Sequence, residues 1–289
     1  MPAPRQSSRR AVTSSGRTGT PALRAGEELG AGSPGRYSSS LAAGLAILDS
    51  FSSERPELGI ANLADKLNMS RSTTHRYAST LVALGYLEQD GSRRYRLAPR
   101  VADLGFALLD SMALRRAARE ELRALREQTG RTVSMAIRDG VEIMYIEWLR
   151  GWRRGQYAIN LDVGIGAHLP IYCTSIGKQL LAHLPEPQRE QLIRELKLTR
   201  RGPNTITSKR ELRAELEHVR ESGLALSDEE LAAGLRTIAA PIFTDDGEAP
   251  AAIALSVPSE AFSREELLDG LGPSLASAAE RITAALRAG

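Results

Sequence analysis

The sequence at positions 58–97 reads LGIANLADKLNMSRSTTHRYASTLVALGYLEQDGSRRYRL, and this stretch decides the fold. Apolar residues recur at helical spacing over residues 60–67, and Asn68-Met69 forms a turn after them. Ser70 can cap a second helix, because its hydroxyl can accept a hydrogen bond from a free backbone N–H. Gly85 is expected to end that helix. The pattern therefore predicts two short helices joined by a tight turn.

The second predicted helix begins with a cluster of polar side chains on the face opposite its apolar side. In a helix-turn-helix, the first turns of this helix enter the major groove, so the side chains that read bases are polar and lie near its N-terminus. Arginine can pair bidentately with guanine, and serine or threonine can reach bases or phosphates. The side chains expected to contact DNA are Ser70, Arg71, Ser72, Thr74, His75 and Arg76.

A short β-hairpin is predicted directly after this helix. Residues 86–88 and 93–97 flank Asp90-Gly91, which is a typical hairpin turn. The tip and the returning strand are basic, so the hairpin can lie against a phosphate backbone as a wing. Its DNA-contacting side chains are expected to be Arg93, Arg94 and Arg96. A small helical bundle with a solvated charged face is the alternative for the helix pair alone, and the polar cluster and basic wing favour DNA binding.

Composition limits the remaining possibilities. The 289 residues carry a net charge of +3, with 42% hydrophobic and 25% charged residues, as in a globular protein with one large or two ordinary domains. Residues 1–37 are rich in Pro, Gly, Ser and Arg and are predicted to be a disordered basic tail, which touches nucleic acid or only solubilises the chain. The single cysteine, Cys173, excludes an internal disulfide, and no apolar run suits a membrane span or a signal peptide. A cytoplasmic protein is expected.

The remainder of the chain predicts a second domain. A helical stretch from Pro99 to Thr129 follows the wing, and strand-like runs then alternate with helices, beginning with a hairpin at Asp139-Gly140. We therefore expect an α+β protein with an N-terminal winged helix-turn-helix, a linker helix and a C-terminal α/β domain. The expected boundaries are 38–98, 99–115 and 116–289. Further strands are expected at 156–161, 224–227, 237–243 and 251–257, and helices at 174–183, at 187–195, from Ser208 and from Ser263, the last interrupted or restarted at Gly272-Pro273.

Several separate blocks resemble the IclR family of bacterial regulators over residues 40–287. They read SLAAGLAILDSF, ADKLNMSRSTTHRYASTLVALGYLEQD and YRLAPRVADLG, then GIGAHLPIYCTSIGKQLLAHL, SDEELAAGLRTIAAPIF and AAIALSVP. The family pattern G-x-x-x-P…T-x-x-G-K-x-x-L-A is met by Gly166, Pro170, Thr174, Gly177, Lys178, Leu181 and Ala182.

The resemblance implies a GAF-like effector domain, a homodimer or homotetramer, and a palindromic double-stranded DNA operator whose binding a small organic molecule controls. The segments PRVADLGFALLDS and LPIYCTSIGK are similar to the branch that controls aromatic catabolism through the β-ketoadipate route. Repression and activation both remain open.

The resemblance also implies an effector site. Its expected residues are Leu149, Trp152, Asn160, Gly166, Ala167, Ser227, Leu235, Thr237, Ala254 and Ser256. Gly166 and Ala167 would offer backbone N–H groups to a carboxylate, and Trp152 suits a flat ring. This chain departs from the family's small-acid pattern, because Ser227, Thr237 and Ala254 replace an Asp, a Cys and a Ser. The hypothesis is therefore an aromatic or ring-derived carboxylate.

Two other functions are compatible with parts of the sequence. Cys173 and His168 could form a nucleophile and a base, but no third group orients them, and a lone cysteine is more often a packed small hydrophobe. The histidines lack metal-ligand spacing, and Gly177-Lys178 lacks the other glycine and the hydroxyl of a phosphate loop. No enzyme, cofactor, metal or membrane partner is therefore expected. The second rival is a DNA-binding protein whose C-terminal domain only forms oligomers.

Overall fold

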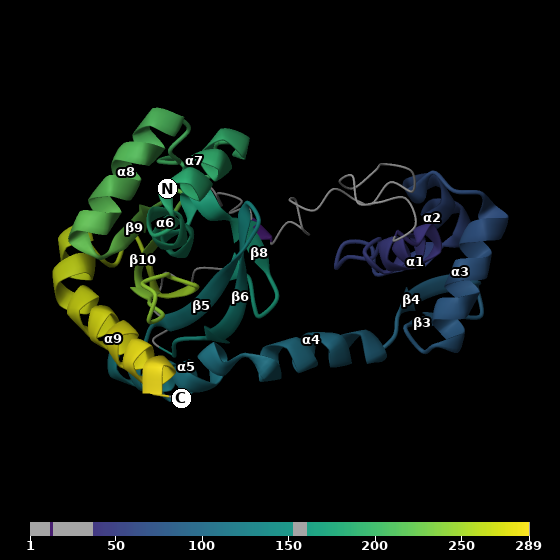
Figure 1. Cartoon of the computed structure of the whole chain (residues 1–289), viewed down its shortest axis with the longest axis horizontal. Helices are drawn as coiled ribbons and strands as arrows, with labels where there is room; N and C mark the ends of the chain where they lie inside the picture. Colours follow the sequence, from purple (N-terminus) through teal and green to yellow (C-terminus); the bar gives the residue numbers. More distant parts are fainter. Residues whose placement is uncertain (1–11, 14–36, 153–160, 289) are drawn as a thin grey trace, which may run out of the picture. The chain divides into compact units, whose positions relative to one another are not determined.

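The computed structural model describes residues 12–13, 37–152 and 161–288. The described residues divide into two compact units: residues 37–111 lie in one, and residues 112–152 and 161–288, together with Val12–Thr13, lie in the other. The predicted strand at 156–161 and most of the predicted tail lie outside the described residues. Val12–Thr13 forms strand β1, which pairs in parallel with β7 (Leu161–Asp162). Figure 1 shows the elements in chain order.

The N-terminal unit is a winged helix-turn-helix, which confirms the predicted fold class. Its elements are α1 (Ser39–Leu48), β2 (Glu57–Gly59), α2 (Ile60–Leu67), α3 (Arg71–Ala83), β3 (Leu87–Gln89), β4 (Arg94–Leu97) and α4 (Arg100–Ser111). The three strands pair antiparallel in the order β2-β4-β3, and β2 was not predicted. Helices α1, α2 and α3 pack around a core that includes Ile47, Leu63, Ala78 and Tyr95.

The turn between α2 and α3 depends on one residue with a left-handed backbone. Asn68 has φ 52° and ψ 46°, a conformation that asparagine tolerates better than most residues. The chain can then reverse, and Ser70 begins α3 by accepting a hydrogen bond from Thr73 N at 3.1 Å. The predicted turn and cap are thus confirmed.

The C-terminal unit contains a six-stranded antiparallel sheet in the order β8-β6-β5-β11-β10-β9. Its strands are β5 (Thr132–Asp139), β6 (Glu142–Leu149), β8 (His168–Pro170), β9 (Ala225–Asp228), β10 (Leu235–Ile242) and β11 (Ala251–Pro258). Its helices are α5 (Ala113–Thr129), the 3-10 helix η1 (Ile171–Cys173), α6 (Ser175–Ala182), α7 (Glu186–Glu195), α8 (Lys209–Ser222), the π-helix η2 (Glu266–Leu271) and α9 (Gly272–Ala288).

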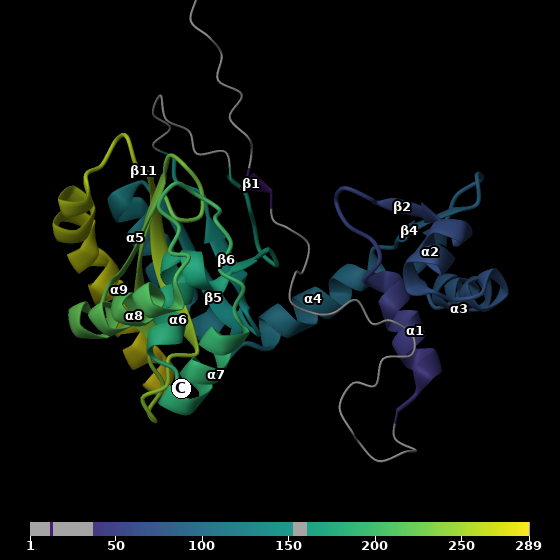
Figure 2. The same ribbon diagram turned by 90° about the horizontal axis from the view of Figure 1, so that it is seen from above.

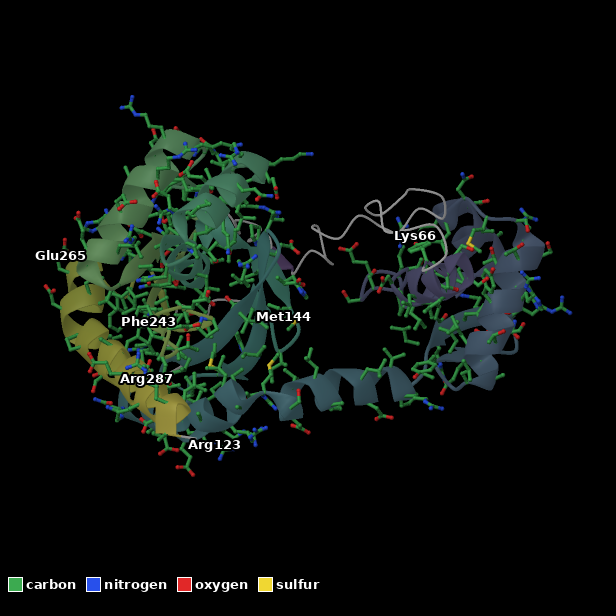
Figure 3. All side chains as sticks on the ribbon, in the orientation of Figure 1. Lys66, Arg123, Met144, Phe243, Glu265 and Arg287 are labelled. Carbon is green, nitrogen blue, oxygen red and sulfur yellow. The ribbon has the colours of Figure 1, made fainter. Side chains whose placement is uncertain are left out.

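Helices cover both faces of this sheet, as Figures 1 and 2 show. Helix α6 packs on one face, while α5 and α9 pack on the other and against each other. Helix α5 is amphipathic: Leu122 and Leu125 are buried, and Arg123 points away from the core (Figure 3). The predicted continuous helix at 99–129 is instead two helices, because Met112 adopts an extended backbone between α4 and α5.

Helix α6 is buried along its whole length, and two residues of the T-x-x-G-K pattern explain how. A Cβ on Gly177 would lie 1.9 Å from the carbonyl oxygen of Ile171, so only glycine fits there. Lys178 Nζ lies 2.6 Å from Glu230 Oε1 and 2.7 Å from Glu215 Oε1, which neutralises a lysine that is 1% exposed. These contacts join α6 to η1, to α8 and to the loop after β9.

Among the described residues, every helix is too short or too polar to cross a bilayer.

Candidate DNA-binding surface and effector site

The edge of α3 carries exposed donors near the start of the helix. Arg71, Ser72, His75 and Arg76 are exposed. Within the described part of the chain, Arg71 and His75 have no ion pair or hydrogen bond, whereas the Arg76 guanidinium lies over the Tyr77 ring at 5.3 Å. The edge therefore presents cationic and polar groups that a DNA groove could bind.

Two of the residues expected at this edge have other roles. Thr74 is fully buried, and its hydroxyl donates a hydrogen bond to the carbonyl oxygen of Ser70 at 2.9 Å. The prediction that Thr74 contacts DNA is therefore wrong, because Thr74 shares a helix face with the buried Ala78 and Leu81. The hydroxyl of Ser70 caps the helix. Ser79, two steps of four residues after Arg71, is also exposed on α3.

In the wing, the three arginines differ in their partners. Arg94 forms an ion pair with Glu57 at 2.8 Å, and Arg96 forms one with Glu88 at 2.7 Å. Arg93, at the tip, has no such partner in the described residues and takes a left-handed backbone with φ 62°. The carboxylate of Asp90 holds the turn, and the backbone N–H of Arg94 that bonds to it lowers the pKa of Asp90.

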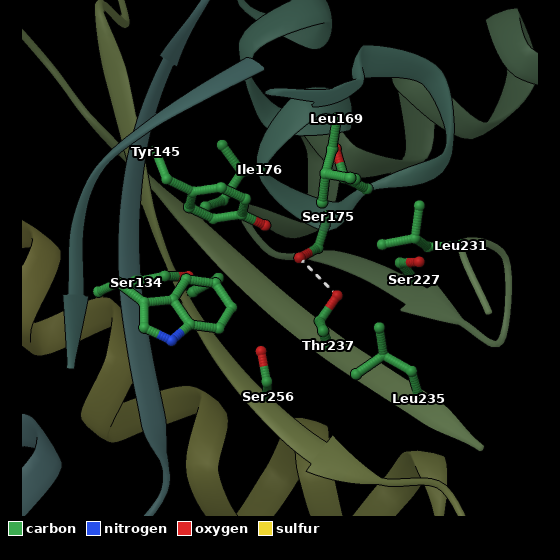
Figure 4. Close-up of a pocket in the computed structure, with 13 residues that line it drawn as sticks. Ser134, Tyr145, Leu169, Ser175, Ile176, Ser227, Leu231, Leu235, Thr237 and Ser256 are labelled. Atoms are coloured by element: carbon green, nitrogen blue, oxygen red, sulfur yellow. Dashed lines mark hydrogen bonds between the residues drawn. The ribbon is translucent and has the colours of Figure 1, made fainter. Parts of the chain in front are cut away.

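A small enclosed cavity lies in the C-terminal unit between the sheet and the start of α6 (Figure 4). Its free volume is about 20 Å³, which is the room of about one water molecule. Its walls mix apolar side chains with hydroxyl groups, the combination typical of a small-molecule site. They are formed by Ser134, Tyr145, Trp148, Leu169, Thr174, Ser175, Ile176, Ser227, Leu231, Leu235, Thr237, Ala254 and Ser256.

Half of the expected effector residues lie in this wall. Ser227, Leu235, Thr237, Ala254 and Ser256 line the cavity. Four others do not line it, namely Leu149, Trp152, Gly166 and Ala167. Asn160 lies outside the described residues.

A β-bulge explains why Leu149 is displaced from the wall. Tyr145 pairs with Ala136 and Glu147 with Met135, so Ile146 is an extra residue in β6. Strict alternation from Tyr145 would place Leu149 on the same face, but the extra residue shifts the alternation by one. Trp148 therefore joins Tyr145 in the wall, and their rings meet edge to face with centroids 4.9 Å apart.

The other three expected residues outside the wall also make contacts elsewhere. Trp152 is 51% exposed, and its ring lies under the guanidinium of Arg126 at 5.4 Å. The backbone N–H of Gly166 already donates to the carbonyl oxygen of Tyr145 at 2.8 Å, and that of Ala167 donates to Gly164 at 3.0 Å. These N–H groups are therefore not free to bind a carboxylate.

Some polar groups of the cavity wall are satisfied. Ser175 Oγ and Thr237 Oγ1 bond each other at 2.8 Å, and Ser227 Oγ donates to the carbonyl oxygen of Cys173 at 3.1 Å. Ser134 Oγ and Trp148 Nε1 are buried and have no partner in the described residues. Both were missed from the sequence. The signal for Ser134 was a lone serine among the apolar residues of β5.

The cysteine does not behave as a nucleophile. Cys173 is fully buried, and burial raises the pKa of its thiol to about 12, with Glu230 adding to the effect. The thiol is therefore protonated at neutral pH. His168 Nε2 instead pairs with Asp139 Oδ2 at 2.9 Å.

A winged helix-turn-helix joined to a separate unit with a polar-lined cavity defines a DNA-binding transcriptional regulator. Two family models match the chain: the IclR helix-turn-helix domain over residues 40–91 and the bacterial transcriptional regulator IclR C-terminal domain over residues 106–284. The chain belongs to the IclR family, and its relatives are transcriptional regulators rather than enzymes.

Individual relatives agree with this assignment. The Pca regulon regulatory protein of Pseudomonas putida is 34% identical over 242 residues, which cover 84% of this chain and 82% of that protein. The Thermotoga maritima IclR structure has a TM-score of 0.68 and 29% identity, covering 86% of this chain and 98% of that one. An IclR homologue from Microbacterium hydrocarbonoxydans, solved in complex with 4-hydroxybenzoate, has a TM-score of 0.74 and 26% identity, covering 86% of this chain and 100% of that one.

Proposed function

We propose that this regulator binds a palindromic operator as a dimer, and that an aromatic or ring-derived carboxylate in the C-terminal cavity changes its affinity for that operator. The observation that carries the ligand half is the pair of buried donors, Ser134 Oγ and Trp148 Nε1, with no protein partner. A buried donor without a partner costs about 1–3 kcal/mol, so an acceptor group on a ligand would recover that energy.

The aromatic character of the ligand rests on the walls and on two relatives. Tyr145 and Trp148 form an aromatic pair that can stack with or against a ring. One structural relative was solved with 4-hydroxybenzoate, and another relative is named for the Pca regulon.

The operator half rests on the edge of α3 and on the wing tip. Arg71, Ser72, His75 and Arg76 are assigned to the major groove, and Arg93 to the phosphate backbone. A palindrome requires two copies of the winged unit. Dimerisation is supported by apolar side chains that are exposed on α1 and α4 and need a partner. They are Leu41, Leu45, Leu104, Phe106 and Leu108.

Titration calorimetry with 4-hydroxybenzoate, benzoate, glyoxylate and pyruvate tests the ligand half, and footprinting upstream of the protein's own gene with and without these acids tests the operator half. Binding of the aromatic acids, with a changed footprint, is the expected result. Binding of glyoxylate or pyruvate alone would overturn the aromatic assignment. Binding of none of the acids, with an unchanged footprint, would favour a C-terminal domain that only forms oligomers.

A further inference from the structure

A buried ion pair joins the back of the cavity wall to the first turn of α5. Arg115 Nε lies 2.8 Å from Glu147 Oε1, and the two side chains are only 12% and 8% exposed. The same nitrogen donates a hydrogen bond to the carbonyl oxygen of Ile146 at 3.2 Å. Arg115 thus contacts the extra residue of the bulge and its neighbour, both of which lie between Tyr145 and Trp148 in β6.

The segment that Arg115 holds is the least supported part of the cavity wall. On its outer side, β6 pairs with β8 only from Glu142 to Met144, and Tyr145 bonds to the chain at Gly166 and Ala167. From Ile146 onward, no strand pairs with that edge in the part of the chain that the structure describes. A bulge also weakens the ladder on the inner side. Arg115 therefore adds a contact to a segment that no outer strand pairs with among the described residues.

The cavity must expand to admit any organic acid. Its free volume of about 20 Å³ is the room of about one water, so a ring displaces wall side chains. The opposite wall is anchored, because Lys178 is held by two carboxylates and Gln179 donates to the carbonyl oxygens of Gly223 and Ala239 at 2.8 and 2.9 Å. The wall that can yield is the β6 segment carrying Trp148.

We infer that Arg115 and Glu147 are positioning residues that transmit ligand entry from the Trp148 segment of β6 to the start of α5. This inference rests on the proposed effector site. A ligand that moves Trp148 also moves the bulge carbonyl and Glu147, and Arg115 carries that movement to the first turn of α5. Only Met112 separates the end of α4 from the start of α5, so the first turn of α5 is where the C-terminal unit joins the linker.

The first test needs no ligand and no operator. It is a double-mutant cycle on the full chain between Trp148→Ala and the combined change Arg115→Met with Glu147→Gln. The combined change removes the ion pair, together with the 3.8 Å contact between Glu147 and the half-exposed Arg119, without leaving a buried charge. Hydrogen exchange of the α5 amides is measured, with α2 of the N-terminal unit as an internal reference. We expect Trp148→Ala to speed exchange in the first two turns of α5 several-fold when the ion pair is present, and to have no further effect when it is absent.

Additive effects on exchange would overturn the inference, because they would show that the cavity wall and α5 respond independently. Arg115→Lys keeps one charged contact and should restore part of the response. The matched control is Arg213→Met with Glu190→Gln, which removes another ion pair of the same unit away from the cavity. Far-ultraviolet circular dichroism and a cooperative thermal unfolding transition verify that each variant is folded.

The second test separates this inference from the proposed function. The combined Arg115 and Glu147 variant should bind 4-hydroxybenzoate as the wild type does, while its operator affinity no longer changes with the ligand. A variant whose operator affinity still responds like the wild type would overturn the coupling and leave the proposed function intact. Failure of the wild type to bind any aromatic acid would overturn the proposed function, and the exchange cycle would still decide the coupling.

Discussion

The edge of α3 and the wall of the effector cavity both carry hydrogen-bond donors without a protein partner, but the two sets differ in their surroundings. Arg71 and His75 are exposed, so water satisfies them and the free protein loses nothing. Ser134 Oγ and Trp148 Nε1 are buried, where a donor without a partner costs about 1–3 kcal/mol. An unpaired donor at the surface therefore indicates a site only through its position in the fold, whereas a buried donor beside a cavity can be satisfied by an acceptor placed in that cavity.

The largest loss of binding is expected from a substitution on the exposed edge of α3. Arg71→Ala should weaken operator binding by about 10- to 100-fold, because a bidentate arginine–guanine contact discriminates by about 1–3 kcal/mol. Fluorescence anisotropy with the mapped operator measures this. Arg210→Ala removes the same charge from an exposed site on α8 in the other unit and should have no effect. Normal binding by Arg71→Ala would remove this residue from the major groove.

A smaller loss of affinity, here for the effector, is expected from a substitution in the cavity wall. Trp148→Phe keeps an aromatic ring but removes the Nε1 donor and part of the indole, so 4-hydroxybenzoate should bind about tenfold more weakly, as expected for one lost hydrogen bond to a charged group. The melting temperature of the free protein should fall only through the packing lost with the indole, because the removed donor had no protein partner. Trp152→Phe is the matched control and should bind the acid normally. If Trp152→Phe is the weaker binder instead, the expectation that Trp152 contacts the ligand would be reinstated.

Substitutions in the wing should weaken operator binding still less, and the loss should differ between Arg93 and Arg94. Arg93→Ala should weaken binding to all sequences a few-fold and reduce the salt slope by about one, as for the loss of one phosphate contact. Arg94→Ala should do less, because Glu57 already neutralises this arginine. Titrations at several salt concentrations compare the two variants. Equal slopes would show that DNA displaces Glu57 from Arg94.

The sequence predicts the order of elements well because local signals specify them. The caps at Ser70 and Ser208 and the turn at Asn68 act within a few residues, and all three appear where they were expected. The break at Met112 had no such signal. The residue carries no turn preference, so the separation of α4 from α5 depends on packing in the folded chain.

Predicting the effector site from the sequence was harder, because its wall depends on pairing between strands. The bulge at Ile146 exists only in the register of β6 against β5, and this register brings Trp148 into the wall in place of Leu149. The ion pair between Arg94 and Glu57 likewise depends on β2, which was not predicted. By contrast, the burial of Thr74 was predictable, because steps of four and seven residues join it to Ala78 and Leu81.

The smallest effect on DNA binding is expected from Thr74→Val. The hydroxyl of Thr74 is buried and donates to the carbonyl oxygen of Ser70, so its loss should lower the free energy of unfolding by about 1 kcal/mol. Operator affinity should stay unchanged, because the side chain does not reach the edge of α3. Ser72→Ala is the matched control with the opposite pattern: its unfolding free energy should stay constant while operator binding weakens. Urea denaturation and anisotropy together separate the two variants, and loss of operator binding by a stable Thr74→Val protein would place this hydroxyl at the DNA and overturn the face assigned to α3.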